Sequence, residues 1–262
     1  MSALLRLENL SAGYDSKTII SEINLDLKKG DFCALLGLNG CGKTTLLKAI
    51  TGLLSLKCGS CLIQGLDSTR LSENMRARYI SYIPQRHSKL DGVTVLDAVM
   101  MGFYAKLGFL EFPGSASKAA ALEALKKMGL ESLAGDDFSR LSEGQKQLVI
   151  LTRTLIQNTP LILMDEPDSA LDFQNSRRIM AKFRHLVKME AKAALISLHD
   201  PGLALNYCDR LLLMNNGKIV FDIYPYDSDI TKIEKSLSSI YNGIVLREFD
   251  GSYAAMLRVS EK

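Results

Sequence analysis

The sequence contains no long apolar run. The longest runs, such as residues 161–164, have the length of a β-strand, whereas a membrane helix needs about 18 consecutive apolar residues. The first residues also lack a basic leader followed by an apolar stretch and a small-residue cleavage site. We therefore expect a protein that does not itself span a membrane, carries no secretory signal and resides in the cytosol.

Cysteine is scarce, with 5 residues among 262, and the number is odd. Cys33 lies within an apolar, strand-like stretch, which is typical of a reducing compartment rather than of a disulfide framework. Cys58 and Cys61 have the spacing of a metal or redox pair, but no second cysteine or histidine pair lies nearby to complete a tetrahedral zinc site. We interpret these two cysteines as part of a loop and a strand.

Neither sign of charge dominates. Lysine and arginine number 32 against 29 acidic residues, and the net charge of +3 is too small and too evenly spread to predict a nucleic-acid or anionic-lipid partner. Hydrophobic residues make up 47% and charged residues 23%, which excludes a disordered, collagen-like or coiled-coil chain. A globular chain of this length can bury a substantial core without disulfides.

Apolar residues alternate near the N-terminus and recur later in short, strand-like runs. Residues 5–7 and 19–27, interrupted by Gly13, predict two antiparallel strands. The further predicted strands cover residues 31–37, 61–64, 79–83, 161–164, 193–197 and 210–214. Helical patterns between the later strands indicate an α/β sheet.

Strand signals vanish between Pro84 and Pro160. The helices predicted there cover residues 93–103, 116–127 and 142–157, so we expect an inserted helical subdomain at about residues 86–158. After Tyr226, an amphipathic segment at residues 230–240 and apolar runs around Asp250-Gly251 predict a small helix and a hairpin. This divides the chain into a main domain, residues 1–225, and a C-terminal appendage, residues 226–262.

A glycine-rich turn between a predicted strand and a predicted helix carries the clearest chemical signal. It has the phosphate-binding pattern of two glycines five positions apart followed by Gly-Lys-Thr, in the run Gly37-Leu38-Asn39-Gly40-Cys41-Gly42-Lys43-Thr44-Thr45. Glycines let successive backbone N–H groups turn inward around an anion, and the helix N-terminus adds partial positive charge. Lys43 is expected to reach the β- and γ-phosphates of a nucleotide, and the Thr44 hydroxyl to ligate Mg²⁺.

Two carboxylates end the apolar run at residues 161–164. Asp165 is placed to hold Mg²⁺ through water, and Glu166 to polarise the water that attacks the γ-phosphate. Alone, such a pair could be an acidic turn on the surface. Close to a phosphate-binding loop it predicts nucleotide hydrolysis.

Ser142, Gly144 and Gln145 open the last helix of the predicted insertion. Ser142 alone would be an ordinary helix cap. The order of phosphate loop, Ser-x-Gly-Gln at a helix start and acidic strand, however, resembles the ATP-binding cassette (ABC) ATPases over nearly the whole chain. The resemblance implies an α/β P-loop ATPase with a mixed core sheet, an N-terminal antiparallel β subdomain and the inserted helical subdomain.

The resemblance also implies roles for residues that are bland by themselves. Tyr14 falls where the family stacks an aromatic ring on adenine, and Gln85 where a glutamine contacts Mg²⁺ and relays to the membrane partner. Asp172 falls in the loop that meets the opposite subunit, and His199 at the switch histidine that touches the γ-phosphate. The presence of both Glu166 and His199 disfavours a degenerate, inactive cassette.

Two positions depart from the family pattern. Glu143 stands where a glycine is usual in the signature, and Asp168 stands where threonine is commoner. A carboxylate at position 143 would repel a triphosphate unless its side chain points away.

Several segments are similar to the ABC ATPases of importers for iron-siderophore, haem and cobalamin-type metal chelates. They are residues 75–85, residues 94–102 and residues 171–173. This implies an ATPase that closes as a head-to-tail dimer, works with separate transmembrane permease subunits and an extracytoplasmic substrate-binding protein, and lies on the cytoplasmic face of the membrane. An apolar stretch at residues 99–109 suits docking of a permease helix, although it could equally be core.

A different class of function stays open at this point. The chain could be a soluble cassette ATPase with no transport role, for example in iron–sulfur cluster assembly. An ATPase subunit need never touch the transported substrate, so the sequence does not identify that substrate or the permease.

Overall fold

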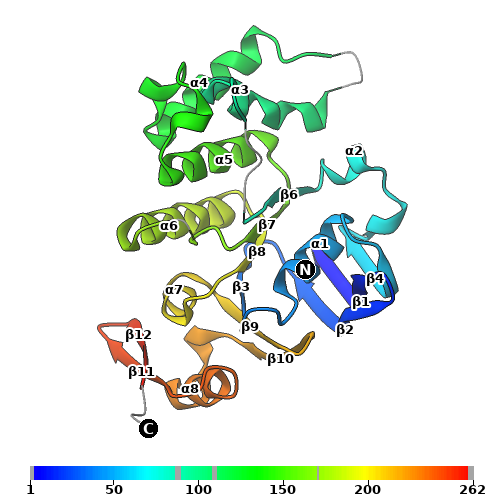
Figure 1. The fold of residues 1–262 in the computed structure, drawn as a ribbon, viewed down its shortest axis with the longest axis vertical. Helices are drawn as coiled ribbons and strands as arrows, with labels where there is room; N and C mark the ends of the chain where they lie inside the picture. The colour runs from blue at the N-terminus through cyan, green and yellow to red at the C-terminus, as the bar shows by residue number, and fades with distance from the viewer. Residues whose placement is uncertain (1–2, 86–89, 108–110, 170, 259–262) are drawn as a thin grey trace.

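A computed structural model describes residues 3–85, 90–107, 111–169 and 171–258. Its centre is a six-stranded sheet in the order β10-β9-β3-β8-β7-β6 (Figure 1). All neighbours in this sheet pair in parallel except β9 and β10, which form an antiparallel hairpin at one edge. The strands are β3 (Phe32–Leu36), β6 (Ile80–Ile83), β7 (Leu161–Asp165), β8 (Ala193–Ser197), β9 (Arg210–Asn215) and β10 (Lys218–Ile223).

The central strands are buried on both faces, which explains their uninterrupted apolar runs. Because side chains alternate along a strand, Phe32, Ala34 and Leu36 enter one hydrophobic cluster of the protein. Cys33 and Leu35, on the other face of β3, enter a second cluster. The sheet therefore separates two cores, and its polar strand ends are left for a site.

An antiparallel sheet and one helix cover one face of the central sheet. The sheet has the order β2-β1-β4-β5, with β1 (Leu5–Tyr14), β2 (Lys17–Leu27), β4 (Leu56–Ile63) and β5 (Leu66–Asp67). Helix α1 (Lys43–Thr51) buries Leu46, Leu47 and Ile50 in the same cluster as this sheet. The short helix α2 (Glu73–Arg76) leads from β5 back to β6.

Two strands, β1 and β4, are considerably longer than the sequence predicts. β1 runs through Gly13 instead of breaking there, because its pairing with β2 continues to Tyr14. A Cβ at Gly13 would lie 2.0 Å from the Lys17 carbonyl oxygen of β2, so this close approach of the strands requires glycine. β4 begins at Leu56, five residues before the predicted start, because its exposed first half pairs with β1. Its Cys58 is exposed and its Cys61 buried.

Helices cover the opposite face and extend beyond it. The predicted helix at residues 93–103 is shorter than expected, since the α-helix ends at Met100 and a 3₁₀ segment, Met101–Lys106, follows. The helices are α3 (Val95–Met100), α4 (Ser115–Met128), α5 (Glu143–Gln157), α6 (Phe173–Met189) and α7 (Pro201–Tyr207). Figure 1 shows α3, α4 and α5 at the end of the molecule remote from the C-terminus. No helix among the described residues combines the length and apolarity needed to cross a bilayer.

The C-terminal segment contributes to the main core. It comprises α8 (Ile230–Ser238) and a hairpin of β11 (Ile244–Phe249) and β12 (Ser252–Leu257). Ile233, Leu237 and Leu246 are buried in the same cluster as the helices and the central sheet. The boundary at residue 226 thus marks a change of structure along the chain rather than a second hydrophobic core.

The apolar stretch at residues 99–109 is mainly core over its described part. Val99 is fully buried, and Met100 and Phe103 pack against the main cluster. Tyr104 is about half exposed. Residues 108 and 109 lie outside the described residues.

Candidate active site

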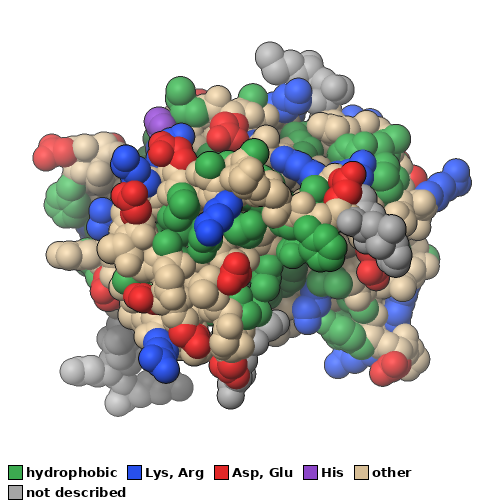
Figure 2. Space-filling model, turned by 90° about the horizontal axis from the view of Figure 1, so that it is seen from above, with side chains coloured by type: hydrophobic (Ala, Val, Ile, Leu, Met, Phe, Trp, Pro, Cys, Tyr) green, Lys and Arg blue, Asp and Glu red, His purple; other side chains and the backbone are tan. Residues whose placement is uncertain are grey.

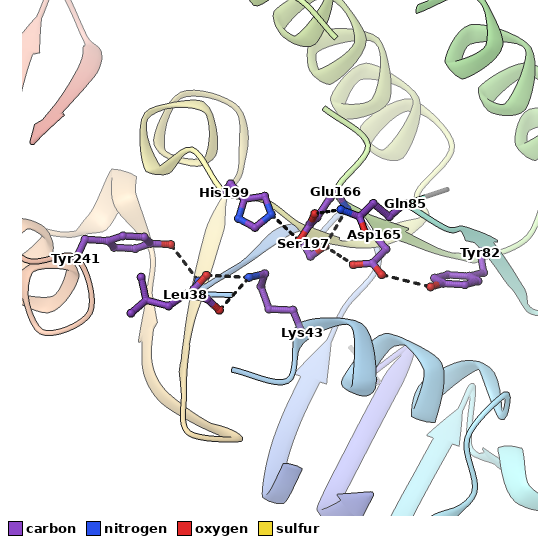
Figure 3. Close-up of polar contacts among 10 residues, drawn as sticks. Leu38, Lys43, Tyr82, Gln85, Asp165, Glu166, Ser197, His199 and Tyr241 are labelled. Atoms are coloured by element: carbon purple, nitrogen blue, oxygen red, sulfur yellow. Dashed lines mark hydrogen bonds and ion pairs between the residues drawn. The ribbon is translucent and has the colours of Figure 1, made fainter. Parts of the chain in front are cut away.

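The glycine-rich turn forms a loop around the Lys43 ammonium (Figure 3). Lys43 Nζ donates to the carbonyl oxygens of Gly37, at 2.8 Å, and Leu38, at 3.3 Å. The side chain is 5% exposed, so the charge is held inside the curve of the loop. The buried ammonium and the N-terminus of α1 therefore both contribute positive charge at this loop.

The glycines of this loop serve different purposes. Gly42 caps α1 with a φ of 110°, and a Cβ there would lie 2.6 Å from Ile20 Cγ2. Gly40, with a φ of 80°, has no atom within 4 Å of its Cβ position. Close packing therefore requires glycine at position 42, whereas Gly40 and its neighbour Asn39 lie at the exposed tip of the loop. The loop is thus packed against the protein at Gly42 and open to solvent at Gly40, an arrangement that allows an anion to enter.

Asp165 lies at the carboxyl end of β7 and is 2% exposed. Ser197 Oγ, on the adjacent strand β8, donates to Asp165 Oδ1 at 2.7 Å, and the Tyr82 hydroxyl lies 3.5 Å from Oδ2. Burial is the main cause of a raised pKa for Tyr82, and the charge of Asp165 adds to it. Tyr82 therefore stays a neutral donor beside the carboxylate.

Glu166 turns away from the strand at a φ of 50°. Its backbone N–H donates to Ser197 Oγ at 2.9 Å, which fixes this turn against β8. The side chain then reaches two partners at once, with Oε1 2.5 Å from His199 Nε2 and Oε2 accepting from Gln85 Nε2. Asp165 and Glu166 consequently have different surroundings although they are neighbours in the chain.

The structure thus brings together five of the predicted residues at the carboxyl ends of parallel strands, where open α/β sheets place their ligands. They are Lys43, Gln85, Asp165, Glu166 and His199. Thr44 and Thr45 lie in the first turn of α1 beside Lys43. This cluster combines a buried cation, a carboxylate with oxygen atoms for a metal and a second carboxylate oriented by two side chains, which suits phosphoryl transfer to water.

The Ser-x-Gly-Gln motif lies at the start of α5, and among the described residues its side chains form no hydrogen bond or ion pair with this cluster. Ser142 and Gln145 form a reciprocal capping box. The Glu143 carboxylate pairs with Lys146 Nζ at 2.8 Å, so its charge is turned along the helix and partly compensated. A Cβ on Gly144 would meet Leu171 Cδ2 at 3.5 Å, an ordinary contact.

The other predicted residues lie at the edges of the site. Tyr14 ends β1 and is 45% exposed, so its ring is accessible. Asp172 caps α6, where Oδ1 accepts from the Asn175 backbone N–H at 2.8 Å. Ala170, in the loop before it, lies outside the described residues.

Sequence reasoning missed four residues that shape the cluster. Ser197 and Tyr82 hold Asp165, and Gln147 Nε2 ties α5 to the Pro167 carbonyl at 2.9 Å. The fourth is Tyr241, whose hydroxyl oxygen accepts from the Gly37 N–H at 3.0 Å. A polar residue ending an apolar strand could have indicated Ser197, but nothing in the local sequence points to Tyr241.

Asp168 lies in the loop between β7 and α6 and has an unusual environment. Its Oδ1 is buried and has no hydrogen-bond partner among the described residues. Burial raises the pKa of this carboxyl, and the charges of Asp200 and Glu166 add to the effect. Aspartate in place of the commoner threonine therefore puts a carboxylate where burial disfavours its charged form.

The fold and this cluster define a P-loop ATPase of the cassette type. The sequence pattern of the ABC transporter family matches residues 20–169, which is more than half of the chain. The chain belongs to this family.

Relatives and solved structures agree with this assignment. An uncharacterized ABC transporter ATP-binding protein of Haemophilus influenzae is 39% identical, with 81% of this chain and 80% of that protein aligned. A "Probable iron chelatin transport ATP-binding protein" of Helicobacter pylori is 32% identical, with 91% and 93% aligned.

Two solved structures extend the comparison. The chain superposes with a TM-score of 0.81 and 27% identity on a transporter assigned to the metal-chelate type in an inward-facing conformation, with 97% and 96% of the two chains covered. It superposes with a TM-score of 0.75 and 26% identity on a dimeric ATP-binding cassette in a post-hydrolysis state bound to ADP and Pi, with 84% and 98% covered. The chain is an ATP-binding subunit of the ABC type, with ATP hydrolysis as its activity.

Proposed function

We propose that this protein energises a membrane importer by hydrolysing ATP, and that the importer carries an iron chelate or another metal chelate. The observation that carries the enzymatic part is the Glu166 carboxylate, oriented by His199 and Gln85 beside the Lys43 loop. The transport part is supported by the likeness to a metal-chelate type transporter and to an iron chelatin transport protein along nearly the whole chain.

The donor set at the strand ends fits Mg²⁺. Asp165 offers a carboxylate whose Oδ2 makes a long contact with the Tyr82 hydroxyl, at 3.5 Å, and Thr44 and Gln85 add a hydroxyl and an amide oxygen. We assign Thr44, Gln85 and Asp165 to this ion. When bound, Mg²⁺ neutralises charge on the β- and γ-phosphate oxygens.

The chain's own residues divide the work of hydrolysis. Lys43 would exchange the carbonyl oxygens of Gly37 and Leu38 for phosphate oxygens, and backbone N–H groups of the loop at residues 39–45 would surround the β-phosphate. Tyr14 would stack on adenine. Glu166 would accept the proton of the attacking water at a carboxylate oxygen, while His199 and Gln85 keep that oxygen directed at the γ-phosphate.

Hydrolysis would take place between two copies of the chain. The loop around Lys43 contacts a triphosphate from one side only, and phosphoryl transfer needs donors on a second side. Ser142, Gly144 and Gln145 supply a hydroxyl and a helix N-terminus for that side when they come from a second copy. Asp172 and its loop would lie at the same interface. ATP binding would close this head-to-tail dimer, and hydrolysis would reset it.

Transport requires membrane partners. We assign permease subunits to the helical end of the molecule, with an extracytoplasmic substrate-binding protein acting through them, and this chain to the cytoplasmic face. Figure 2 looks onto the end that carries α3 and α4 and shows apolar side chains interspersed with charged ones. Among the described residues of this region, Tyr104 and Phe112 are 52% and 80% exposed and could contact a partner.

Purification of the tagged full chain from its own membranes tests this proposal. A multi-span permease should co-purify. When the complex is reconstituted in proteoliposomes, it should transport a ferric chelate only if ATP is present on the side of the membrane that carries this chain. A Lys43→Ala complex is the control and should transport nothing. Recovery of a soluble scaffold without any permease would instead favour the alternative role in cluster assembly and would overturn the importer.

A further inference from the structure

Tyr241 joins the C-terminal segment to the phosphate loop. It lies between α8 and β11, and its hydroxyl oxygen accepts a hydrogen bond from the Gly37 backbone N–H, 204 residues earlier, at 3.0 Å. Figure 3 shows the ring reaching the loop from the side opposite Tyr82. Burial raises the pKa of Tyr241 to about 12, so the hydroxyl is neutral at physiological pH.

Gly37 is held on both sides of its backbone. Its N–H is bound by Tyr241, and its carbonyl oxygen accepts from Lys43 Nζ at 2.8 Å. A Cβ at this position would lie 2.4 Å from the Met214 carbonyl oxygen and 2.7 Å from Cys41 Sγ. Because the residue is enclosed so tightly, the N–H has little freedom to turn toward another partner if the hydroxyl is removed.

The segment that carries Tyr241 is itself firmly anchored. Ile233 and Leu237 of α8 are fully buried, and the Glu234 carboxylate accepts from the Leu246 N–H at 2.6 Å. The backbone N–H and carbonyl of Tyr253, on β12, pair with the Asn206 side chain of α7 at 2.9 and 2.8 Å. Helix α7 begins directly after His199 and Asp200. The segment therefore contacts the phosphate loop and also the helix that follows the histidine.

We propose that Tyr241 is a positioning residue for nucleotide binding, through which residues 230–258 hold the phosphate loop in its binding shape. The proposal rests on the proposed role of residues 37–45 in binding phosphate. Through Gly37, the hydroxyl orients the carbonyl that receives Lys43, and so it sets where the ammonium lies before a nucleotide arrives. The C-terminal segment is then part of the nucleotide site although it touches no substrate.

Tyr241→Phe removes the hydroxyl and keeps the ring that fills the core. We expect the Kd of the full chain for ATP and for ADP to rise by about 3- to 10-fold, the range set by the loss of one hydrogen bond. The kcat at saturating ATP should stay within about twofold, because the hydroxyl contacts the loop and not the cluster around Glu166. A variant that was merely less folded would lose kcat and keep its Kd.

Two controls separate the possible results. Tyr253→Phe makes the same change in the same segment, where the backbone supplies the contacts with Asn206, and should leave Kd unaltered. Lys43→Ala should abolish binding, and wild-type affinity in that variant would refute the phosphate role of the loop itself. Unchanged Kd in Tyr241→Phe, with binding lost in Lys43→Ala, would overturn only the proposal for Tyr241.

Hydrogen exchange gives a second measurement that does not depend on the variant folding. In the wild-type chain without nucleotide, the Gly37 amide should exchange more slowly than the amides of Asn39 and Gly40 at the open tip. Equally fast exchange at Gly37 would contradict the bond to Tyr241 in solution.

Discussion

Glu166 is oriented by two neighbouring side chains, since His199 and Gln85 each hold one of its carboxylate oxygens. Glu166→Gln keeps the size of the side chain but removes the base. We expect kcat for ATP hydrolysis to fall by at least about 100-fold, the usual contribution of a positioned general base, while the Kd for ATP changes little. A steady-state phosphate-release assay of the transporter complex and a nucleotide titration measure the two quantities.

A matched control for this substitution is Glu22→Gln. Glu22 is an exposed glutamate whose carboxylate pairs with Lys218 at the surface, so the same change there should alter neither quantity. If the Glu166 variant hydrolysed ATP at the wild-type rate, the assignment of the base would be wrong.

Asp168 predicts an unusual dependence of stability on pH. Burial raises its pKa in the folded protein above that in the unfolded chain, so the folded state binds this proton more tightly. The destabilisation is therefore complete above the folded pKa and is lost as the pH falls from the folded pKa to the ordinary aspartate value of about 4. Asp168→Asn should stabilise the nucleotide-free protein by about 1 kcal/mol at pH 7, and the gain should shrink toward pH 4.

Asp67→Asn is the comparison variant, for which we expect a loss of stability instead of a gain. Hydrogen bonds from the Thr69 side chain and backbone lower the pKa of Asp67, so this substitution should lower the unfolding temperature at pH 7. Thermal unfolding of both variants between pH 4 and 7 compares the two. A gain for Asp168→Asn that does not vary with pH would refute the electrostatic explanation.

At the scale of an element, the start of helix α5 allows the effect of a substitution on stability to be distinguished from its effect on the proposed catalytic interface. A Cβ on Gly144 would make ordinary contacts, the nearest at 3.5 Å from Leu171 Cδ2. Gly144→Ala should therefore keep the fold and stabilise it by about 0.5–1 kcal/mol, as alanine does for glycine in a helix. ATP hydrolysis should nevertheless fall by at least about tenfold, because the added methyl group would displace the helix start from the facing nucleotide.

Gly102→Ala is the contrasting control. Its Cβ would lie 2.5 Å from the Arg153 carbonyl oxygen of α5, so this variant should lose stability. Unfolding midpoints and phosphate-release rates distinguish the two glycines. Full hydrolysis by Gly144→Ala would remove the start of α5 from the catalytic interface.

At the scale of the whole molecule, the Lys43 loop and the Ser142 motif belong to different parts of one chain. Lys43→Ala removes the first and Ser142→Arg blocks the second, so each variant should be inactive alone. Mixing the two should partly restore hydrolysis, because a head-to-tail mixed dimer contains one composite site with both parts intact. The measurement is the phosphate-release rate as a function of the mixing ratio.

The mixing experiment needs a control for the loss of the helix cap. Arginine at position 142 removes the hydrogen bond that the Gln145 N–H donates to Ser142 Oγ, whereas Ser142→Asn retains a capping side chain. Equal unfolding midpoints for the arginine variant and the wild type would show that the cap loss is tolerated. Full activity of Ser142→Arg by itself would contradict the composite site.

Local sequence was sufficient to predict most of the central strands and to single out the phosphate-loop and acidic residues that the structure brings together. The glycines and lysine of residues 37–45 and the acidic end of the run at 161–166 carry their meaning in adjacent residues, because a phosphate loop and a buried strand are made by short-range patterns. The family resemblance added Tyr14, Gln85, Asp172 and His199, which local pattern alone would have left as ordinary surface residues.

Long-range pairing decided the rest. The early start of β4 depends on β1, and the burial of Val99 depends on packing against other helices, so neither could be predicted from its own segment. Ser197 orients both acidic residues only because β8 lies beside β7 in the sheet. The hydrogen bond from the Gly37 N–H to the Tyr241 hydroxyl joins residues that are 204 positions apart in the sequence. Such contacts are made by tertiary folding, because hydrogen-bond partners far apart in sequence leave no local period or spacing to read.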